Sequence, residues 1–220
     1  MQKYELTENI KSIGVGKSEI TIHQIRALRP IERFGVKDGD FGGWIEKEDN
    51  LTQDHDAWIS LNALVFNNAR LFDNAHVTGT ARVYGTARLF DNAHVTSRAK
   101  IFHTAQVTGD AQVSGNARVY DHARVFGNAQ VFGNAQLFDN ARVFGNAQVF
   151  GNARVFGDAW VCDHTRVFGN SRVYDHARVI ENAEVFDQAE VFGDAEVFGD
   201  IKVYGYLEVN DEWYMYGDEE

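Results

Sequence analysis

Residues 123–158 read ARVFGN AQVFGN AQLFDN ARVFGN AQVFGN ARVFGD, one six-residue phrase repeated without insertion. The same period continues in both directions, from Ala57 to Glu212, and comprises 26 hexads. The first position is Ala in 22 of them, and the third is Val, Ile or Leu in every one. A period this strict predicts a repeat architecture in which each unit is stabilised by stacking on its neighbours.

The residue types within the hexad predict a short strand followed by a corner. Residues two apart on a strand point the same way, so Ala and Val share the inner face while Arg or Gln and Phe or Tyr share the outer face. Gly or Asp and then Asn, Asp or His accept the backbone conformations of a corner. The segments FDNAHVTGT (72–80) and FDNAHVTSR (90–98) recur at a spacing of 18. We therefore expect an all-β triangular prism with 18 residues per coil and 8 to 9 coils.

The segments outside the repeat are expected to close its ends. Residues 20–28 (ITIHQIRAL) alternate as a strand does, Pro30 and Gly42-Gly43 are interpreted as turns, and Trp44 and Trp58 are expected to cover the open Ala/Val end. At the other end, Tyr204, Tyr206, Trp213, Tyr214 and Tyr216 are expected to do the same. The predicted division is a capping region over 1–56, a solenoid over 57–212 and an acidic tail over 213–220.

The composition favours a folded protein with an uneven charge distribution. The 220 residues are 44% hydrophobic, and no stretch is apolar enough for a membrane span. The start has charges where a signal peptide is apolar, and Cys162 is the only cysteine, so we expect a cytoplasmic protein without disulfides. The net charge of -11 divides into -3 for residues 1–56, +4 for 57–180 and -12 for 181–220. The acidic end should oppose head-to-tail stacking.

The repeat resembles the hexapeptide-repeat, left-handed parallel β-helix proteins, and the resemblance implies the left hand of the coil. One departure is the aromatic residue that follows the aliphatic one in 18 of 26 hexads. The segments KYEL (3–6), HQIRAL (23–28), FGVKDGDFGGWIEKEDNL (34–51) and DAWI (56–59) are similar to the start of the YdcK-like bacterial proteins, which carry a transferase label. Hexapeptide proteins often associate through flat faces, so the resemblance also implies homo-oligomers.

The 18-residue period arranges the outward residues in columns on three faces. Rings stacked on rings are favourable, whereas Arg stacked on Arg is repulsive unless corner Asp residues offset it. Aromatic stripes of this length favour a rigidified wall, a side-by-side interface with another copy or another protein, or both. The residues expected in such an interface are Phe132, Phe150, Phe168, Phe126, Phe144, Arg124 and Arg142.

The sequence thus favours a non-enzymatic scaffold or interaction module that self-associates as a dimer or trimer and uses no cofactor. Two alternatives stay open. The resemblance suggests an acyltransferase-like enzyme whose site forms between subunits. The Arg and aromatic columns suggest single-stranded nucleic acid, because such strands are held by basic grooves with stacking rings, although corner Asp residues dilute the positive field.

One corner of the predicted coil collects potential metal ligands. His103, Asp121 and Asp139 fall on successive coils with His122 beside them, a set of imidazoles and carboxylates that suits a divalent metal. Solvated turn residues are the simpler interpretation of the same four. Cys162 lies at an outward position, and the spacing brings no base to it, so we interpret it as a substitution in an aromatic column rather than a nucleophile.

Overall fold

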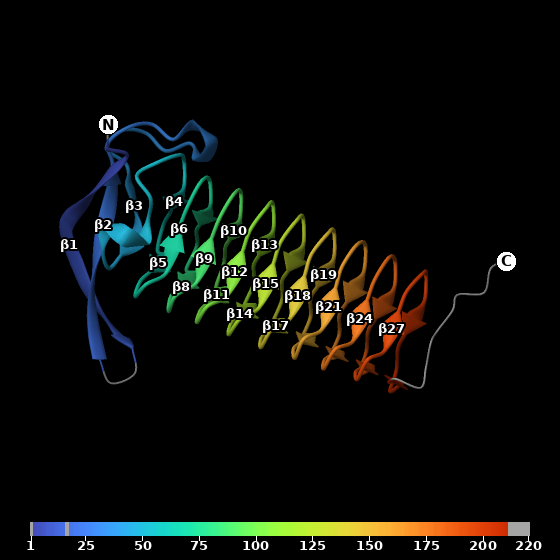
Figure 1. Ribbon diagram of the computed structural model, residues 1–220. Helices are drawn as coiled ribbons and strands as arrows, with labels where there is room; N and C mark the ends of the chain where they lie inside the picture. Colours follow the sequence, from blue (N-terminus) through green and yellow to red (C-terminus); the bar gives the residue numbers. More distant parts are fainter. Residues whose placement is uncertain (1, 16–17, 211–220) are drawn as a thin grey trace.

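The computed structural model describes residues 2–15 and 18–210 as a straight stack of coils with a β-hairpin across its N-terminal end (Figure 1). Each hexad contributes one two-residue strand, from β4 to β29. The parallel solenoid and its small antiparallel cap sheet agree with the predicted all-β class. The nine-stranded face has one strand per coil, so the solenoid makes about nine turns.

Three sheets form the faces. The nine-stranded sheet consists of β4 (Trp58–Ile59), β7 (His76–Val77), β10 (His94–Val95), β13 (Gln112–Val113), β16 (Gln130–Val131), β19 (Gln148–Val149), β22 (Arg166–Val167), β25 (Glu184–Val185) and β28 (Lys202–Val203). The eight-stranded sheet consists of β6 (Arg70–Leu71), β9 (Arg88–Leu89), β12 (Gln106–Val107), β15 (Arg124–Val125), β18 (Arg142–Val143), β21 (Trp160–Val161), β24 (Arg178–Val179) and β27 (Glu196–Val197).

The twelve-stranded sheet includes the cap and consists of β1 (Tyr4–Val15), β2 (Ser18–Ala27), β3 (Phe41–Ile45), β5 (Leu64–Val65), β8 (Arg82–Val83), β11 (Lys100–Ile101), β14 (Arg118–Val119), β17 (Gln136–Leu137), β20 (Arg154–Val155), β23 (Arg172–Val173), β26 (Glu190–Val191) and β29 (Glu208–Val209). Two short 3-10 turns, η1 (Glu32–Phe34) and η2 (Glu48–Asn50), lie in the N-terminal region.

The coil length and the inner face confirm the expectations from the repeat. Gln112 pairs in parallel with Gln130, and Gln130 with Gln148, so each strand lies on the one 18 residues away. The inward Ala and Val side chains, such as Ala129 and Val131, are fully buried. The fifth position of the hexad turns the corner with a positive φ, 70° at Gly133 and 54° at Asp121, which Gly and Asp tolerate better than other residues.

The cap extends the twelve-stranded sheet and covers the first coil. Strand β2 pairs antiparallel with β1 and β3, and β3 pairs in parallel with β5 of the solenoid. The interpretation of Gly42-Gly43 as a turn was wrong, because both lie inside β3, where the backbone passes close to Ile59. Trp58 is buried as expected, but Trp44 lies half-buried on the outer wall beneath the Lys11 amine.

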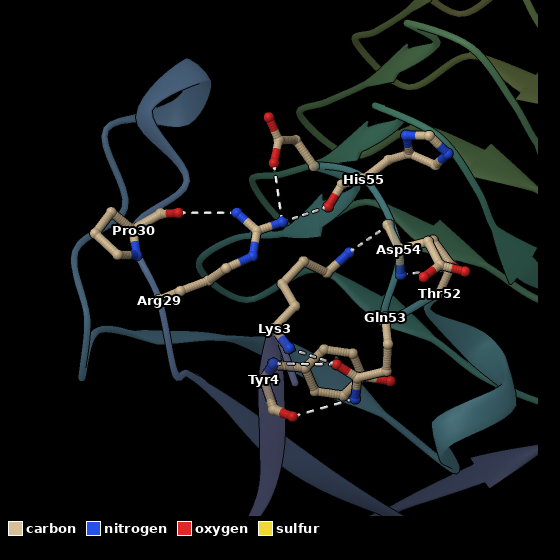
Figure 2. Close-up of polar contacts among 9 residues, drawn as sticks. Lys3, Tyr4, Arg29, Pro30, Thr52, Gln53, Asp54 and His55 are labelled. Carbon is tan, nitrogen blue, oxygen red and sulfur yellow. Dashed lines mark hydrogen bonds and ion pairs between the residues drawn. The ribbon is translucent and has the colours of Figure 1, made fainter. Parts of the chain in front are cut away.

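The Gln53 side chain forms hydrogen bonds with the backbone at the start of β1. The Gln53 side-chain oxygen accepts the backbone N–H of Lys3 at 2.7 Å and that of Tyr4 at 3.3 Å. Its amide nitrogen donates to the Tyr4 carbonyl at 3.2 Å (Figure 2). The Tyr4 hydroxyl donates to the Leu51 carbonyl at 2.7 Å. These bonds join β1 to the segment that leads into the first coil.

Lys3 is a fully buried cation within this junction. Its amine donates one long hydrogen bond, 3.4 Å, to the Asp54 carbonyl (Figure 2). Arg29 beside it already pairs with Asp56 at 3.1 Å. Burial lowers the pKa of Lys3 from 10.5 to about 8; Arg29 adds to the lowering, while Asp56 and Asp54 oppose it. The buried, protonated amine therefore lowers the free energy of unfolding.

Lys3→Met is expected to stabilise the protein by about 2 kcal/mol at pH 7. The lowered pKa corresponds to about 3 kcal/mol, from which about 1 kcal/mol is subtracted for the lost hydrogen bond. The advantage should be full below pH 8 and vanish as pH rises towards 10.5, because the amine is then neutral in both states. Urea denaturation from pH 7 to 10 measures it, with the exposed Lys37→Met as control. A variant less stable than the parent at pH 7 would contradict the prediction.

The C-terminal aromatics do not cover the end of the core in the way expected. Tyr204 stacks on Phe186 on an outer face, and Tyr206 lies at a corner with 81% of its surface exposed. The predicted acidic tail, residues 213–220, and its aromatics lie outside the described residues. Within the described part, no helix is long and apolar enough to cross a membrane.

Candidate interaction surface

The outward aromatic residues form ladders along the solenoid. On the twelve-stranded face, successive ring centroids lie 4.8 to 5.2 Å apart, and neighbouring planes are within 10° of parallel. This ladder runs without a gap through Phe66, Tyr84, Phe102, Tyr120, Phe138, Phe156, Tyr174 and Phe192. The expectation that ring stacks on ring at the coil spacing is confirmed here.

The cap itself packs on the first ring of this ladder. Phe66 is only 3% exposed and clusters with Leu64 and Ile22, while Ile13 and Ile20 of the hairpin pack against the same cluster. Rings farther along the ladder are half-buried. Aliphatic side chains of the β1–β2 hairpin therefore cover the first ring of the ladder.

The nine-stranded face carries a shorter ladder beside neutral side chains. Phe132, Phe150 and Phe168 stack at 4.8 and 4.9 Å, and Phe186 and Tyr204 continue the series. The neighbouring column on this face contains Gln112, Gln130 and Gln148. Arg166 continues this column, lies over the Phe150 and Phe168 rings, and pairs with Glu184 at 3.1 Å. Three of the predicted interface residues thus lie together beside neutral glutamines and one charge-paired arginine.

The eight-stranded face differs, because its ladder is interrupted. Phe126 and Phe144 stack at 4.7 Å beside the exposed Arg124 and Arg142, but Thr108 precedes this pair and Cys162 follows it. The Arg142 guanidinium lies over the Trp160 ring, 5.1 Å from its centroid. The predicted interface residues thus lie on two faces, and the aromatic column of the eight-stranded face is interrupted.

Cys162 is buried, and its thiol donates to Asp163 at 3.5 Å. Burial and the Asp163 carboxylate raise the pKa of the thiol to about 12. Because the thiolate is the reactive form of cysteine, a raised pKa makes this thiol inert at neutral pH. Its position in the column of Phe126 and Phe144 agrees with a substitution in an aromatic ladder.

The stacking geometry decides what the ladders present to a partner. In each ladder the planes are nearly parallel at about 5 Å, so both faces of an inner ring contact its neighbours. Only the ring edges point outward. A nucleobase or a sugar ring bound by stacking needs a free aromatic face. The ladders are therefore flat apolar walls rather than stacking platforms.

Several Arg residues of the columns make favourable contacts that the sequence did not suggest. Arg154 lies over the Phe138 and Phe156 rings at 5.2 and 5.7 Å, a cation–π arrangement. In the last coils, three successive Arg residues each meet a Glu one coil later: Arg166–Glu184 at 3.1 Å, Arg172–Glu190 at 3.0 Å and Arg178–Glu196 at 2.8 Å. The corner Asp residues instead accept backbone N–H groups, as Asp91 does from Gly109 at 3.0 Å.

The predicted metal ligands are only partly brought together. His103 Nδ1 lies 2.6 Å from Asp121 Oδ1, whereas His122 Nδ1 lies 2.6 Å from the Thr104 hydroxyl. Asp139 accepts the backbone N–H of Gly157 at 3.2 Å. Among residues 2–15 and 18–210 there is no group of three His, Cys, Asp or Glu side chains arranged to hold a metal ion. The His103–Asp121 pair and the contacts of His122 and Asp139 are those expected of neighbouring corner residues in a coil.

Comparison with known proteins finds a similar repeat in part of the solenoid. The model of the YdcK β-solenoid repeat matches residues 111–121, 117–133, 135–149 and 147–163. This stretch of the chain is similar to the YdcK β-solenoid repeat. These matches lie in the repeat, whereas the resemblance found in the sequence lay mainly in the cap.

A curated relative is similar to part of the chain. The chain is 33% identical over 86 residues to a protein of Escherichia coli (strain K12) named "Uncharacterized acetyltransferase YdcK". The match covers 37% of this chain and 26% of the relative. This chain therefore spans about a quarter of the length of the YdcK relative that it matches.

Proposed function

We propose that this YdcK-like protein is a non-enzymatic scaffold that self-associates side by side through its nine-stranded face, as a dimer or trimer in the cytoplasm. The ladder of Phe132, Phe150 and Phe168 carries the proposal. Its ring edges form a flat apolar strip, the adjacent Gln130 and Gln148 are uncharged, and the charge of the adjacent Arg166 is paired with Glu184. A strip of this kind on a soluble protein is typical of an interaction site.

Charge favours this face over its neighbours for contact with a second copy. The twelve-stranded face carries Lys100, Arg118 and Arg154 in one column, and the eight-stranded face carries Arg124 and Arg142. Such columns would face like columns in a homotypic contact. An antiparallel pair of rods would also place the acidic last coils of one copy, -7 over residues 181–210, beside the body of the other, +4 over 57–180.

The test changes charge on this face and keeps every ring. Gln130→Lys with Gln148→Lys places like charges in the homotypic contact, so we expect the dissociation constant to rise at least about tenfold, equivalent to about 1.4 kcal/mol. Light scattering should give a multiple of 24.8 kDa for the parent and a mass close to 24.8 kDa for the variant.

The matched control adds the same two charges elsewhere, as Gln106→Lys with Gln136→Lys on the other two faces, and should keep the parent mass. A monomeric parent at 100 μM protein would overturn the proposal, as would a double variant that keeps the parent mass.

Acetyl transfer, the label of the E. coli relative, is the alternative. Thermal shift with coenzyme A on the same preparations tests it.

A further inference from the structure

The repeat departs from its own pattern in two consecutive coils under the cap. His occupies the second position of the hexad only at His76 and His94. The fourth position, aromatic in most hexads, is Thr78 and Thr96 in these two. His94 pairs with His76 in the nine-stranded sheet, so the two departures lie side by side. Coil stacking alone does not require His and Thr at these positions, so this local departure from the repeat indicates a further role.

The cap turns this place into a cleft. The segment carrying η1 extends from the cap along the first coils (Figure 1), and the Phe34 ring stacks on His76 at 4.2 Å. The His76 ring stacks in turn on His94 at 5.2 Å. The cleft has a volume of about 300 Å³ and is lined by Arg33 and Phe34 from the cap and by His76, His94, Asn92 and Asp110 from the solenoid.

The imidazoles in this cleft are uncharged at neutral pH. Burial lowers the pKa of His76 to about 4, and the neighbouring His94 contributes to the lowering. Burial also lowers the pKa of His94. A neutral imidazole has one hydrogen-bond donor and one acceptor. Ser60 already engages His76 Nε2 at 2.9 Å, which orients that ring.

The remaining polar groups form an ordered row of amides and one carboxylate. Asn74 donates to Asn92 at 3.3 Å, and Asn92 donates to Asp110 at 2.8 Å, so the row spans three coils. Gln112 adds a further amide. Parallel strands are about 4.8 Å apart, so the row is about 10 Å long. Arg33 and Asp110 provide one positive and one negative charge, which leaves the cleft without net charge.

These groups match hydroxyls better than ions. The amides of this row offer donors and acceptors together, and each hydroxyl of a sugar is likewise both. A single cation balanced by a single anion favours a neutral ligand over a phosphate or an amine. A row of about 10 Å is long enough for one or two linked sugar rings. We propose that this cleft binds a neutral carbohydrate of one or two sugar units through hydrogen bonds.

The cleft lies on the same nine-stranded face as the proposed self-association, but at the end under the cap and not along the Phe132 ladder. Sugar binding and oligomer mass are measured separately, so either proposal can fail without the other. Saturation-transfer NMR of the full chain tests it with glucose, galactose, N-acetylglucosamine, maltose and lactose. We expect transfer to at least one of these sugars. Glucose 6-phosphate and glucosamine serve as charged probes and should give weaker transfer.

Gln112→Leu and Asn92→Leu should each reduce the transfer at least fivefold, because both remove amides from the cleft. Gln136→Leu, the same exchange on the twelve-stranded face, should leave it unchanged. Gln112 is exposed, so its replacement does not disturb the core, and circular dichroism checks the fold of each variant. Absence of transfer to every neutral sugar would overturn the proposal. Undiminished transfer with Gln112→Leu, or stronger transfer to a charged probe, would also overturn it.

Discussion

Gly43→Ala is expected to destabilise the protein by about 3 kcal/mol or more, although it adds a single methyl group. A Cβ at this position of β3 would lie 2.4 Å from Ile59 Cγ2 and 2.8 Å from the Ala63 carbonyl oxygen. Ile59 is fully buried, and the Ala63 carbonyl accepts the Trp44 N–H at 3.0 Å, so neither can give way without breaking the junction. Overpacking of a close-packed core typically costs about 1–3 kcal/mol, and a clash with backbone adds to this.

Urea denaturation followed by tryptophan fluorescence measures the loss, since Trp44 and Trp58 flank the contact. Gly14→Ala in β1 is the matched control, because nothing lies within 4 Å of its added Cβ. That variant should change the free energy of unfolding by less than about 1 kcal/mol. Equal denaturation midpoints for Gly43→Ala and Gly14→Ala would show that β3 does not pack on the first coil as described.

Asn50→Asp is expected to cost about 3 kcal/mol or more at pH 7, because Asn50 is a fully buried clamp with all its bonds made. Its oxygen accepts the N–H groups of Glu46 at 3.1 Å and Lys47 at 3.0 Å. Its amide nitrogen donates to the carbonyls of Asn67 at 3.0 Å and Ala69 at 2.8 Å. An aspartate keeps the first two bonds but turns a carboxylate oxygen towards two carbonyl oxygens. Each buried group left unpaired costs about 1–3 kcal/mol.

The same substitution should make stability depend on pH. Burial against two carbonyls favours the protonated acid, so the pKa of the new carboxyl should be raised in the folded state. The folded state then binds more protons than the unfolded state, and part of the lost stability should return as pH falls from 7 towards 5. Asn68→Asp, an exposed neighbour that accepts the Lys47 amine at 2.8 Å, should show neither effect. A pH-independent loss in Asn50→Asp would contradict this account.

These two positions illustrate what the sequence did not reveal about the cap. Gly42-Gly43 was interpreted as a turn because glycine pairs usually mark turns, but here glycine is required by close approach between β3 and Ile59. Nothing in the local sequence distinguishes Asn50 from the many surface Asn residues of the repeat. Its role depends on Asn67 and Ala69, which belong to the next coil.

For the candidate surface, the period alone predicted which rings share a column. The stacking of Phe132, Phe150 and Phe168 follows directly from their spacing of 18. The orientation of the rings did not follow, and it is the parallel planes that remove the free faces needed for base stacking. The neutral state of His76 was also invisible, because the burial that lowers its pKa comes partly from Phe34, 42 positions earlier in the chain.

The sequence by itself determined the solenoid: its three faces, its coil of 18 residues and its Ala and Val interior. Those features depend on contacts between residues at a constant separation, and a strict repeat displays that separation openly. The tertiary structure alone decided the packing of the cap on the first coil, the cleft beneath η1 and the edge-on ladders. These features arise where non-repeating residues meet the repeat, or from side-chain orientation, and neither is encoded in a period.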